Sequence, residues 1–232
     1  MTPKTLDHVA LWVADRDPIA DFARRYFGMH VIERNDAFTL VGVDARRFKL
    51  TLFAAQRPRE RGALKHVALR VRDLDAALSG LAAVPLERPT PGEAYLDVAE
   101  GLRLGLVEAE TDVDFDLDHV ALFSAAAEES AREYARLGFT RASPGRSGSP
   151  RVELNGGYVE LHRGEPGDPE RPLLNHLAVL VDSAEEHRSE AERRGIEVAD
   201  FVDAANTRAV FVWGPERVKI EYVEHKPTFN LV

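Results

Sequence analysis

The sequence predicts an α+β protein in which four βαβββ modules pair into two half-barrel domains. The first observation behind this prediction is an apolar, strand-like segment with a histidine at its third position, which occurs four times. The copies are LDHVALW at 6–12, LKHVALR at 64–70, LDHVALF at 117–123 and LNHLAVL at 174–180. The second observation is the spacing of the four histidines, 58, 53 and 57 residues, which indicates repeated supersecondary units.

Each histidine segment is followed by a helical pattern and then by short strand-like runs. The helical stretches are DPIADFARRYFG, DLDAALSGLAA, EESAREYARLG and SAEEHRSEAERRG. Residues that favour helix N-caps and C-terminal stops flank them, namely Asp15, Asp73 and Ser183 at the starts and Gly28, Gly138 and Gly195 at the ends. Within the later run RVELNGGYVELHR, the Gly156-Gly157 pair predicts a hairpin.

Three stretches of linker composition separate the modules, at 56–63, 108–116 and 164–171. We expect the acidic middle stretch to divide the chain into 1–112 and 113–232, each with two modules. Because one small open sheet cannot bury both of its faces alone, the two modules of each half are expected to pair around a cavity. The first half is expected to be structural and metal-free, and the second half to carry a metal site.

Composition limits the classes of partner. The 232-residue chain has a formal net charge of −9, which argues against nucleic acid or an anionic membrane as a partner. It has no cysteine, so a metal site would need nitrogen and oxygen ligands. No apolar run approaches the roughly 18 residues of a membrane span, and the N-terminus lacks a signal-peptide pattern. We therefore expect a cytoplasmic protein that binds a small molecule, and the sequence leaves a homo-oligomer open.

Strand parity places all four histidines on one side of the sheets. Side chains alternate between faces along a strand, so the aliphatic residues of each segment face the helix and each histidine faces the concave side. In the last strands of modules 3 and 4, the same parity turns Glu160 and Glu221 toward the concave side. The matching positions of modules 1 and 2 are Thr51 and Gly105. Only the last two modules therefore combine an inward histidine with an inward carboxylate.

Two imidazoles and one or two carboxylates on a concave surface predict a metal site. This ligand set suits Fe(II), Mn, Ni, Co or Zn, and two histidines with one carboxylate are typical of non-haem Fe(II) oxygen chemistry. A buried glutamate without a partner costs several kcal/mol, which favours a bound cation over simple packing. The candidate ligands are His119, His176, Glu160 and Glu221. His8 and His66 have no matching carboxylate, and we interpret them as structural.

The repeated LDHVAL openings and the closing segment WGPERVKIEYVEH resemble the vicinal oxygen chelate superfamily. This superfamily includes glyoxalase I, bleomycin-resistance proteins and extradiol dioxygenases, and the resemblance covers nearly the whole chain. A four-module chain is most similar to the type I extradiol dioxygenases, which implies that His119, His176 and Glu221 bind Fe(II). The implied reaction is ring cleavage of a catechol-type aromatic diol with O2.

The resemblance also implies roles in proton transfer and leaves other reactions open. His162 is the nearest counterpart of the acid–base histidine of these dioxygenases. Phe211 stands where they have a tyrosine, so Asn206 becomes the candidate for hydrogen bonding to the substrate. With Glu160 as a fourth ligand, the set instead resembles glyoxalase I and implies an isomerase or lyase. A non-catalytic small-molecule binding protein of the bleomycin-resistance type is the third alternative.

Overall fold

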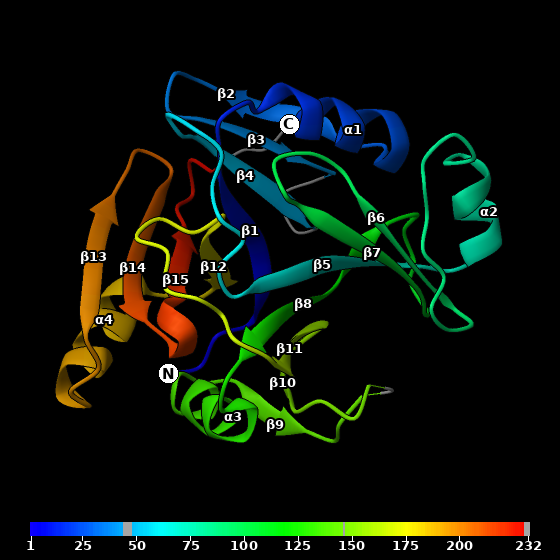
Figure 1. The fold of residues 1–232 in the computed structure, drawn as a ribbon. Helices are drawn as coiled ribbons and strands as arrows, with labels where there is room; N and C mark the ends of the chain where they lie inside the picture. Colours follow the sequence, from blue (N-terminus) through cyan, green and yellow to red (C-terminus); the bar gives the residue numbers. More distant parts are fainter. Residues whose placement is uncertain (44–47, 146, 230–232) are drawn as a thin grey trace.

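In the computed structural model, the described residues form two mixed β-sheets, of eight and seven strands, which carry the helices on their outer sides (Figure 1). The structure describes residues 1–43, 48–145 and 147–229. Module 1 comprises β1 (Thr5–Val13), α1 (Asp17–Phe27), β2 (His30–Arg34), β3 (Phe38–Gly42) and β4 (Lys49–Ala54). Module 2 comprises β5 (Leu64–Val71), α2 (Leu74–Ser79), β6 (Glu93–Asp97) and β7 (Arg103–Glu108).

The last two modules complete the repeat. Module 3 comprises β8 (Asp116–Ser124), α3 (Ala127–Arg136), β9 (Thr140–Ala142), β10 (Arg151–Leu154) and β11 (Gly157–Arg163). Module 4 comprises β12 (Leu174–Leu180), α4 (Ala184–Arg193), β13 (Val198–Asp203), β14 (Thr207–Trp213), the short 3-10 turn η1 (Pro215–Arg217) and β15 (Lys219–His225). The predicted α+β fold is confirmed. In module 2, the place of the outer strand is taken by an isolated bridge between Glu87 and Tyr95.

The modules pair as 1 with 4 and 2 with 3. Strand β1 runs antiparallel to β12, with Val9 opposite Leu177, and β5 runs antiparallel to β8, with Val67 opposite Val120. Figure 1 shows β1 beside β12 and β4, and β5 beside β8. The sheets therefore do not divide the chain into 1–112 and 113–232.

The physical reason for this difference lies in the first strand of each module. Each of these strands pairs in parallel with the last strand of its own module and leaves its other edge free. The four first strands are almost identical in sequence, so their local pattern does not determine which of the other first strands each one pairs with. The acidic linker 108–116 joins two modules of the same sheet, because it connects β7 to β8.

The aliphatic faces of the first strands form the core, as strand parity predicts. Val9 and Leu11 of β1 and Leu177 and Val179 of β12 have no exposed surface. Full burial of such a side chain stabilises the fold by about 1.5–3 kcal/mol. One continuous cluster of buried apolar residues includes members from both sheets. The histidine-bearing face of each sheet is left to line a cavity.

The helices begin at polar caps in two of the three predicted places. The Asp73 carboxylate accepts a hydrogen bond from the Ala76 amide at 2.9 Å, and the Ser183 hydroxyl accepts one from the Glu186 amide at 3.2 Å. Helix α1 begins at Asp17 after Arg16 rather than at Asp15, whose carboxylate accepts from the Asp17 amide at 3.1 Å. Among the described residues, no helix has both the length and the apolar character needed to cross a membrane.

Candidate metal centre

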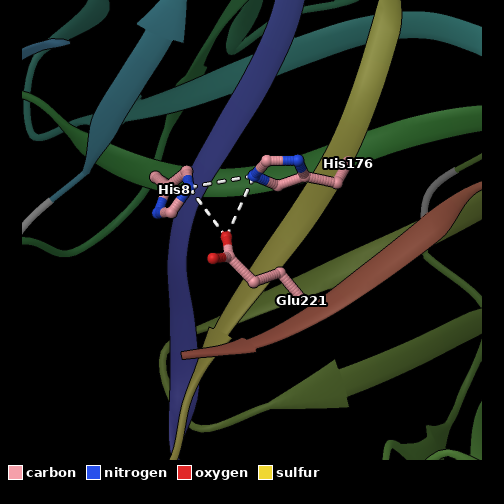
Figure 2. Close-up of side chains that lie close together, drawn as sticks. All are labelled: His8, His176 and Glu221. Carbon is pink, nitrogen blue, oxygen red and sulfur yellow. Dashed lines mark hydrogen bonds and ion pairs between the residues drawn. The ribbon is translucent and has the colours of Figure 1, made fainter. Parts of the chain in front are cut away.

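Two histidines and a glutamate converge on the concave face of the eight-stranded sheet. His8 comes from β1, His176 from β12 and Glu221 from β15, and Figure 2 shows their side chains pointing toward one another. The strand register brings them together, because Ala10 lies opposite His176 and Ala178 lies opposite Glu221. The alanine methyl groups leave room beside each imidazole.

The three ligand atoms form a nearly equilateral triangle. His8 Nε2 lies 3.2 Å from His176 Nε2 and 3.1 Å from Glu221 Oε2, and His176 Nε2 lies 2.9 Å from Glu221 Oε2. Adjacent ligands bound at about 2.1 Å around an octahedral ion are separated by about 3 Å. The triangle therefore has the dimensions of one face of such an ion, which leaves the opposite face for other ligands.

Neighbouring side chains fix the orientation of both imidazoles. His8 Nδ1 donates to Asp7 Oδ2 at 2.8 Å, and His176 Nδ1 donates to Asn175 Oδ1 at 3.2 Å. Lys49 Nζ in turn donates to Asp7 Oδ1 at 2.8 Å. A proton on Nδ1 leaves the Nε2 lone pair free for a cation, so both rings present a ligand atom to the same point.

The charges of this cluster call for a cation. Glu221 is 7% exposed, and although two imidazole nitrogens lie near its Oε2, neither makes a hydrogen bond of acceptable geometry. Burial disfavours the carboxylate, but the charge of His176 and the neighbouring His8 outweigh it and lower the pKa of Glu221 to about 2. The residues present therefore fit a divalent metal ion, which would give the buried oxygen its missing partner.

When no metal is bound, a proton on His8 supplies part of the positive charge that faces Glu221. Burial opposes protonation of His8, but the hydrogen bond to Asp7 and the negative charge of Glu221 outweigh it and raise the pKa of His8 to about 9. His176 differs, because burial lowers its pKa despite the charge of Glu221. A metal ion would therefore displace one proton, from His8, at neutral pH.

Modules 1 and 4 contribute equivalent strands to the sheet, and the residue of module 1 that corresponds to Glu221 is a threonine. Thr51 of β4 lies opposite Ala10 of β1, as Glu221 of β15 lies opposite Ala178 of β12. The Thr51 side chain is buried and lines the same cavity. The centre thus offers two histidines and one carboxylate rather than two of each.

A cavity of about 830 Å³ opens over the ligand triangle. Its walls are more apolar than polar and include the aromatic side chains of Trp12, Phe38, Phe53, Phe211 and Phe229. Its polar groups include Asn206, Lys219 and His225, the last of which lies 3.5 Å from Asp7 Oδ1 through Nε2. The size and the apolar walls suit a small aromatic molecule.

Comparison with known proteins shows which proteins have a similar sequence or fold. Residues 5–84 match the family model of the Glyoxalase/Bleomycin resistance protein/Dioxygenase superfamily. A putative dioxygenase from Bacillus subtilis superposes with a TM-score of 0.78 at 16% identity, over 97% of this chain and 86% of that one. These two comparisons show that the chain has the fold of this superfamily.

Other solved structures have a similar fold. Glyoxalase I from Zea mays superposes with a TM-score of 0.76 at 15% identity, over 95% of this chain and 92% of that one. The cppA protein from Streptococcus pneumoniae TIGR4 gives a TM-score of 0.61 at 14% identity, over 96% and 98% of the two chains. No curated protein sequence matches the chain. The superfamily fold is shared with proteins of different activity, so the reaction has to be inferred from the site.

Three of the residues predicted for the site lie in the other sheet. His119 of β8 faces His66 of β5 across the seven-stranded sheet, with 2.9 Å between their Nε2 atoms. Glu160 and His162 of β11 lie in the same cavity, which has a volume of about 560 Å³. His119 and Glu160 therefore do not share a centre with His176 and Glu221, because module 3 pairs with module 2.

The cluster in the seven-stranded sheet is satisfied by its own hydrogen bonds. Glu160 accepts from His162 Nε2 and from Ser147 Oγ, both at 2.7 Å, and Lys65 Nζ donates to His162 Nδ1 at 3.0 Å. Burial opposes ionisation of Glu160, but the bonds from His162 and Ser147 lower its pKa to about 2. Burial and the nearby His119 lower the pKa of His66 to about 2. These groups need no added cation, unlike Glu221.

The residues predicted from the sequence overlap only in part with the candidate metal centre of the structure. His176, Glu221 and Asn206 lie where the metal ligands and the cavity were expected, whereas His162 lies outside this cavity. His8 and His225 were missed. His8 carries the same signal as His119, an inward histidine preceded by aspartate, but its carboxylate partner belongs to another module.

Proposed function

We propose that the protein is a metal-dependent dioxygenase that cleaves the ring of a catechol-type aromatic diol with O2, using Fe(II) held by His8, His176 and Glu221. The observation that supports this proposal is the facial triangle of two imidazoles and one carboxylate. Such a set leaves open positions for two vicinal oxygens and a co-substrate. When bound, a ferrous ion would supply Lewis acidity toward the diol and one-electron chemistry with O2.

The residues of the chain orient the diol and take up its proton. Phe53 and Phe211 lie 6.1 and 5.2 Å from the His176 ring, measured between centroids, so an aromatic substrate beside the triangle would contact both. His225 lines the same cavity, and its Nε2 lies 3.5 Å from Asp7 Oδ1, which makes it the candidate proton acceptor. Asn206 can donate a hydrogen bond to a substrate oxygen.

The two alternatives are less well supported by the geometry. A glyoxalase I-like isomerase or lyase with two histidines and two glutamates would need a carboxylate at Thr51, and Glu160 belongs to the other cavity. A metal-free binding protein would leave the buried Glu221 Oε2 beside His8 without a hydrogen bond of acceptable geometry. The ligand set favours the dioxygenase over both.

O2 consumption by the Fe(II)-loaded protein tests this proposal. The protein is reconstituted anaerobically with Fe(II), mixed with catechol and substituted catechols, and followed by an oxygen electrode and by absorbance of the ring-opened product. O2 uptake in equal ratio to product supports the proposal. Uptake unchanged in Glu221→Gln, or turnover of a hemithioacetal by the Ni-, Co- or Zn-loaded protein without O2 uptake, contradicts it.

A further inference from the structure

Lys219 places a positive charge at the edge of the candidate metal centre. It is the first residue of β15, lies opposite His176 in the strand register, and precedes Glu221 by two residues on the same face of the strand. Its side chain lines the cavity over the ligand triangle. Its ammonium group therefore faces the space that a bound diol would occupy.

Other cations of this cavity are balanced within the protein. The Asp7 carboxylate pairs with Lys49 at 2.8 Å, with His8 at 2.8 Å and with His225 at 3.5 Å. Within residues 1–43, 48–145 and 147–229, Lys219 makes no ion pair and donates no hydrogen bond. Its nearest recorded partners are aromatic, since Nζ lies 6.0 Å from the Phe211 centroid and 5.8 Å from the Trp213 centroid.

Lys219 also lies where two cavities meet. The cavity over the triangle and a smaller one of about 220 Å³ share Lys219, Trp12 and Asn175 in their walls. The smaller cavity is also lined by Arg171 and Arg217 and by the acidic residues Asp168, Glu170 and Glu216. A ligand with its diol at the triangle can therefore extend a substituent past Lys219.

We propose that Lys219 determines specificity by binding an anionic group of the substrate, so that the preferred substrate is a catechol that carries a carboxylate. This inference rests on the proposed function, since it places the diol at the ligand triangle. A carboxylate would provide the charge partner that Lys219 lacks, in a cavity whose aromatic walls reduce competition from water. A neutral catechol would leave the ammonium group unpaired.

Ligand titrations of the Fe(II)-loaded protein under anaerobic conditions test this proposal. Catechol and 3,4-dihydroxybenzoate share the diol and differ in the carboxylate. The wild type is expected to bind the acid about ten- to a hundredfold more tightly than catechol, as a charge-assisted hydrogen bond allows. In Lys219→Gln this advantage is lost while the affinity for catechol changes less than about twofold.

Matched variants exclude a general effect on folding or charge. Lys219→Arg is expected to keep the preference for the acid. Lys219→Glu is expected to reverse it, so that dopamine, a catechol with an ammonium group, binds more tightly than the acid. Lys4→Gln removes a lysine that pairs with Asp182 on the exposed surface, and it should leave every affinity unchanged. Equal losses for catechol and the acid in Lys219→Gln would overturn the proposal.

A separate measurement distinguishes this inference from the proposed function. Benzoate has the carboxylate without the diol, and its binding to the metal-free protein can be followed through tryptophan fluorescence, because Trp213 lies beside Lys219. If neither diol binds but benzoate binds in the wild type and not in Lys219→Gln, the proposed function fails and the role of Lys219 stands. If benzoate does not bind and the acid has no advantage over catechol, the role of Lys219 is overturned.

Discussion

His8 Nε2 lies 3.2 Å from His176 Nε2, although 168 residues separate the two histidines in the chain. The contact follows from the antiparallel pairing of β1 with β12, the first strands of modules 1 and 4. Glu221 joins the pair because β15 runs parallel to β12. The candidate metal centre therefore depends on modules 1 and 4, and the residues of modules 2 and 3 can serve as controls.

Metal content is expected to separate the two histidine pairs. His8→Ala and His176→Ala each remove one of three ligands and should lower metal affinity at least about a hundredfold, whereas His66→Ala and His119→Ala should not change it. Equilibrium dialysis with metal analysis measures this. Loss of metal in His119→Ala together with retention in His8→Ala would contradict the assignment.

The residues that orient the imidazoles are expected to tune metal affinity. Asn175→Ala removes the acceptor of His176 Nδ1 and should weaken metal binding about ten- to a hundredfold while leaving one site per chain. Asp118→Ala is the matched control, because it removes the acceptor of His119 Nδ1, which lies 2.7 Å away in the other sheet. Calorimetric titration with Mn(II) or Zn(II) compares the two variants. Equal weakening in both would contradict the positioning role.

Thr51→Glu is expected to add a fourth ligand. The new carboxylate would occupy the position that corresponds to Glu221, so metal should bind more tightly and O2 uptake should fall as an open position is lost. In the metal-free protein, two buried carboxylates repel each other, so the melting temperature should decrease and recover on metal addition. Thr51→Val, which adds no charge, should show neither effect. Thermal unfolding with and without Zn(II) gives the readout.

Acid is expected to remove a contribution of Glu160 to stability. Its pKa is about 2 in the folded protein, below the ordinary value of 4.5, so the folded state favours the carboxylate. The contribution, on the order of 2 kcal/mol, is complete above pH 4.5 and is lost as the pH falls toward 2. Urea unfolding between pH 3 and 6 should show a steeper loss of unfolding free energy in the wild type than in Glu160→Gln. The same pH dependence of the unfolding free energy in both proteins would contradict this contribution of Glu160.

The sequence predicts the module and the direction of its side chains. Alternation along each first strand places Val9 and Leu11 in the core and His8 on the concave face, and the structure agrees at each of these positions. The closing strands are equally predictable, since Glu221 and Thr51 both line the cavity. These features depend on the alternation of side chains along one strand, so the sequence of that strand is enough to predict them.

The partner of each module could not be predicted from the same pattern. The segments around His8, His66, His119 and His176 are nearly interchangeable, so pairing β1 with β5 would satisfy the local sequence as well as pairing it with β12. The choice depends on contacts between segments far apart in the chain. This explains why the sequence predicts His176 and Glu221 close together, as they lie in the structure, whereas their third partner was expected at His119.

The pairing of modules 1 and 4 has a consequence for how the protein acquires its metal. During synthesis, β1 leaves the ribosome before its partner strand β12. Modules 2 and 3 are made in between and can already pair with each other. The third ligand, Glu221, is present only after β15 has emerged. A partly synthesised chain that lacks β15 therefore cannot bind the ion with full affinity. Metal capture would therefore follow the pairing of modules 1 and 4.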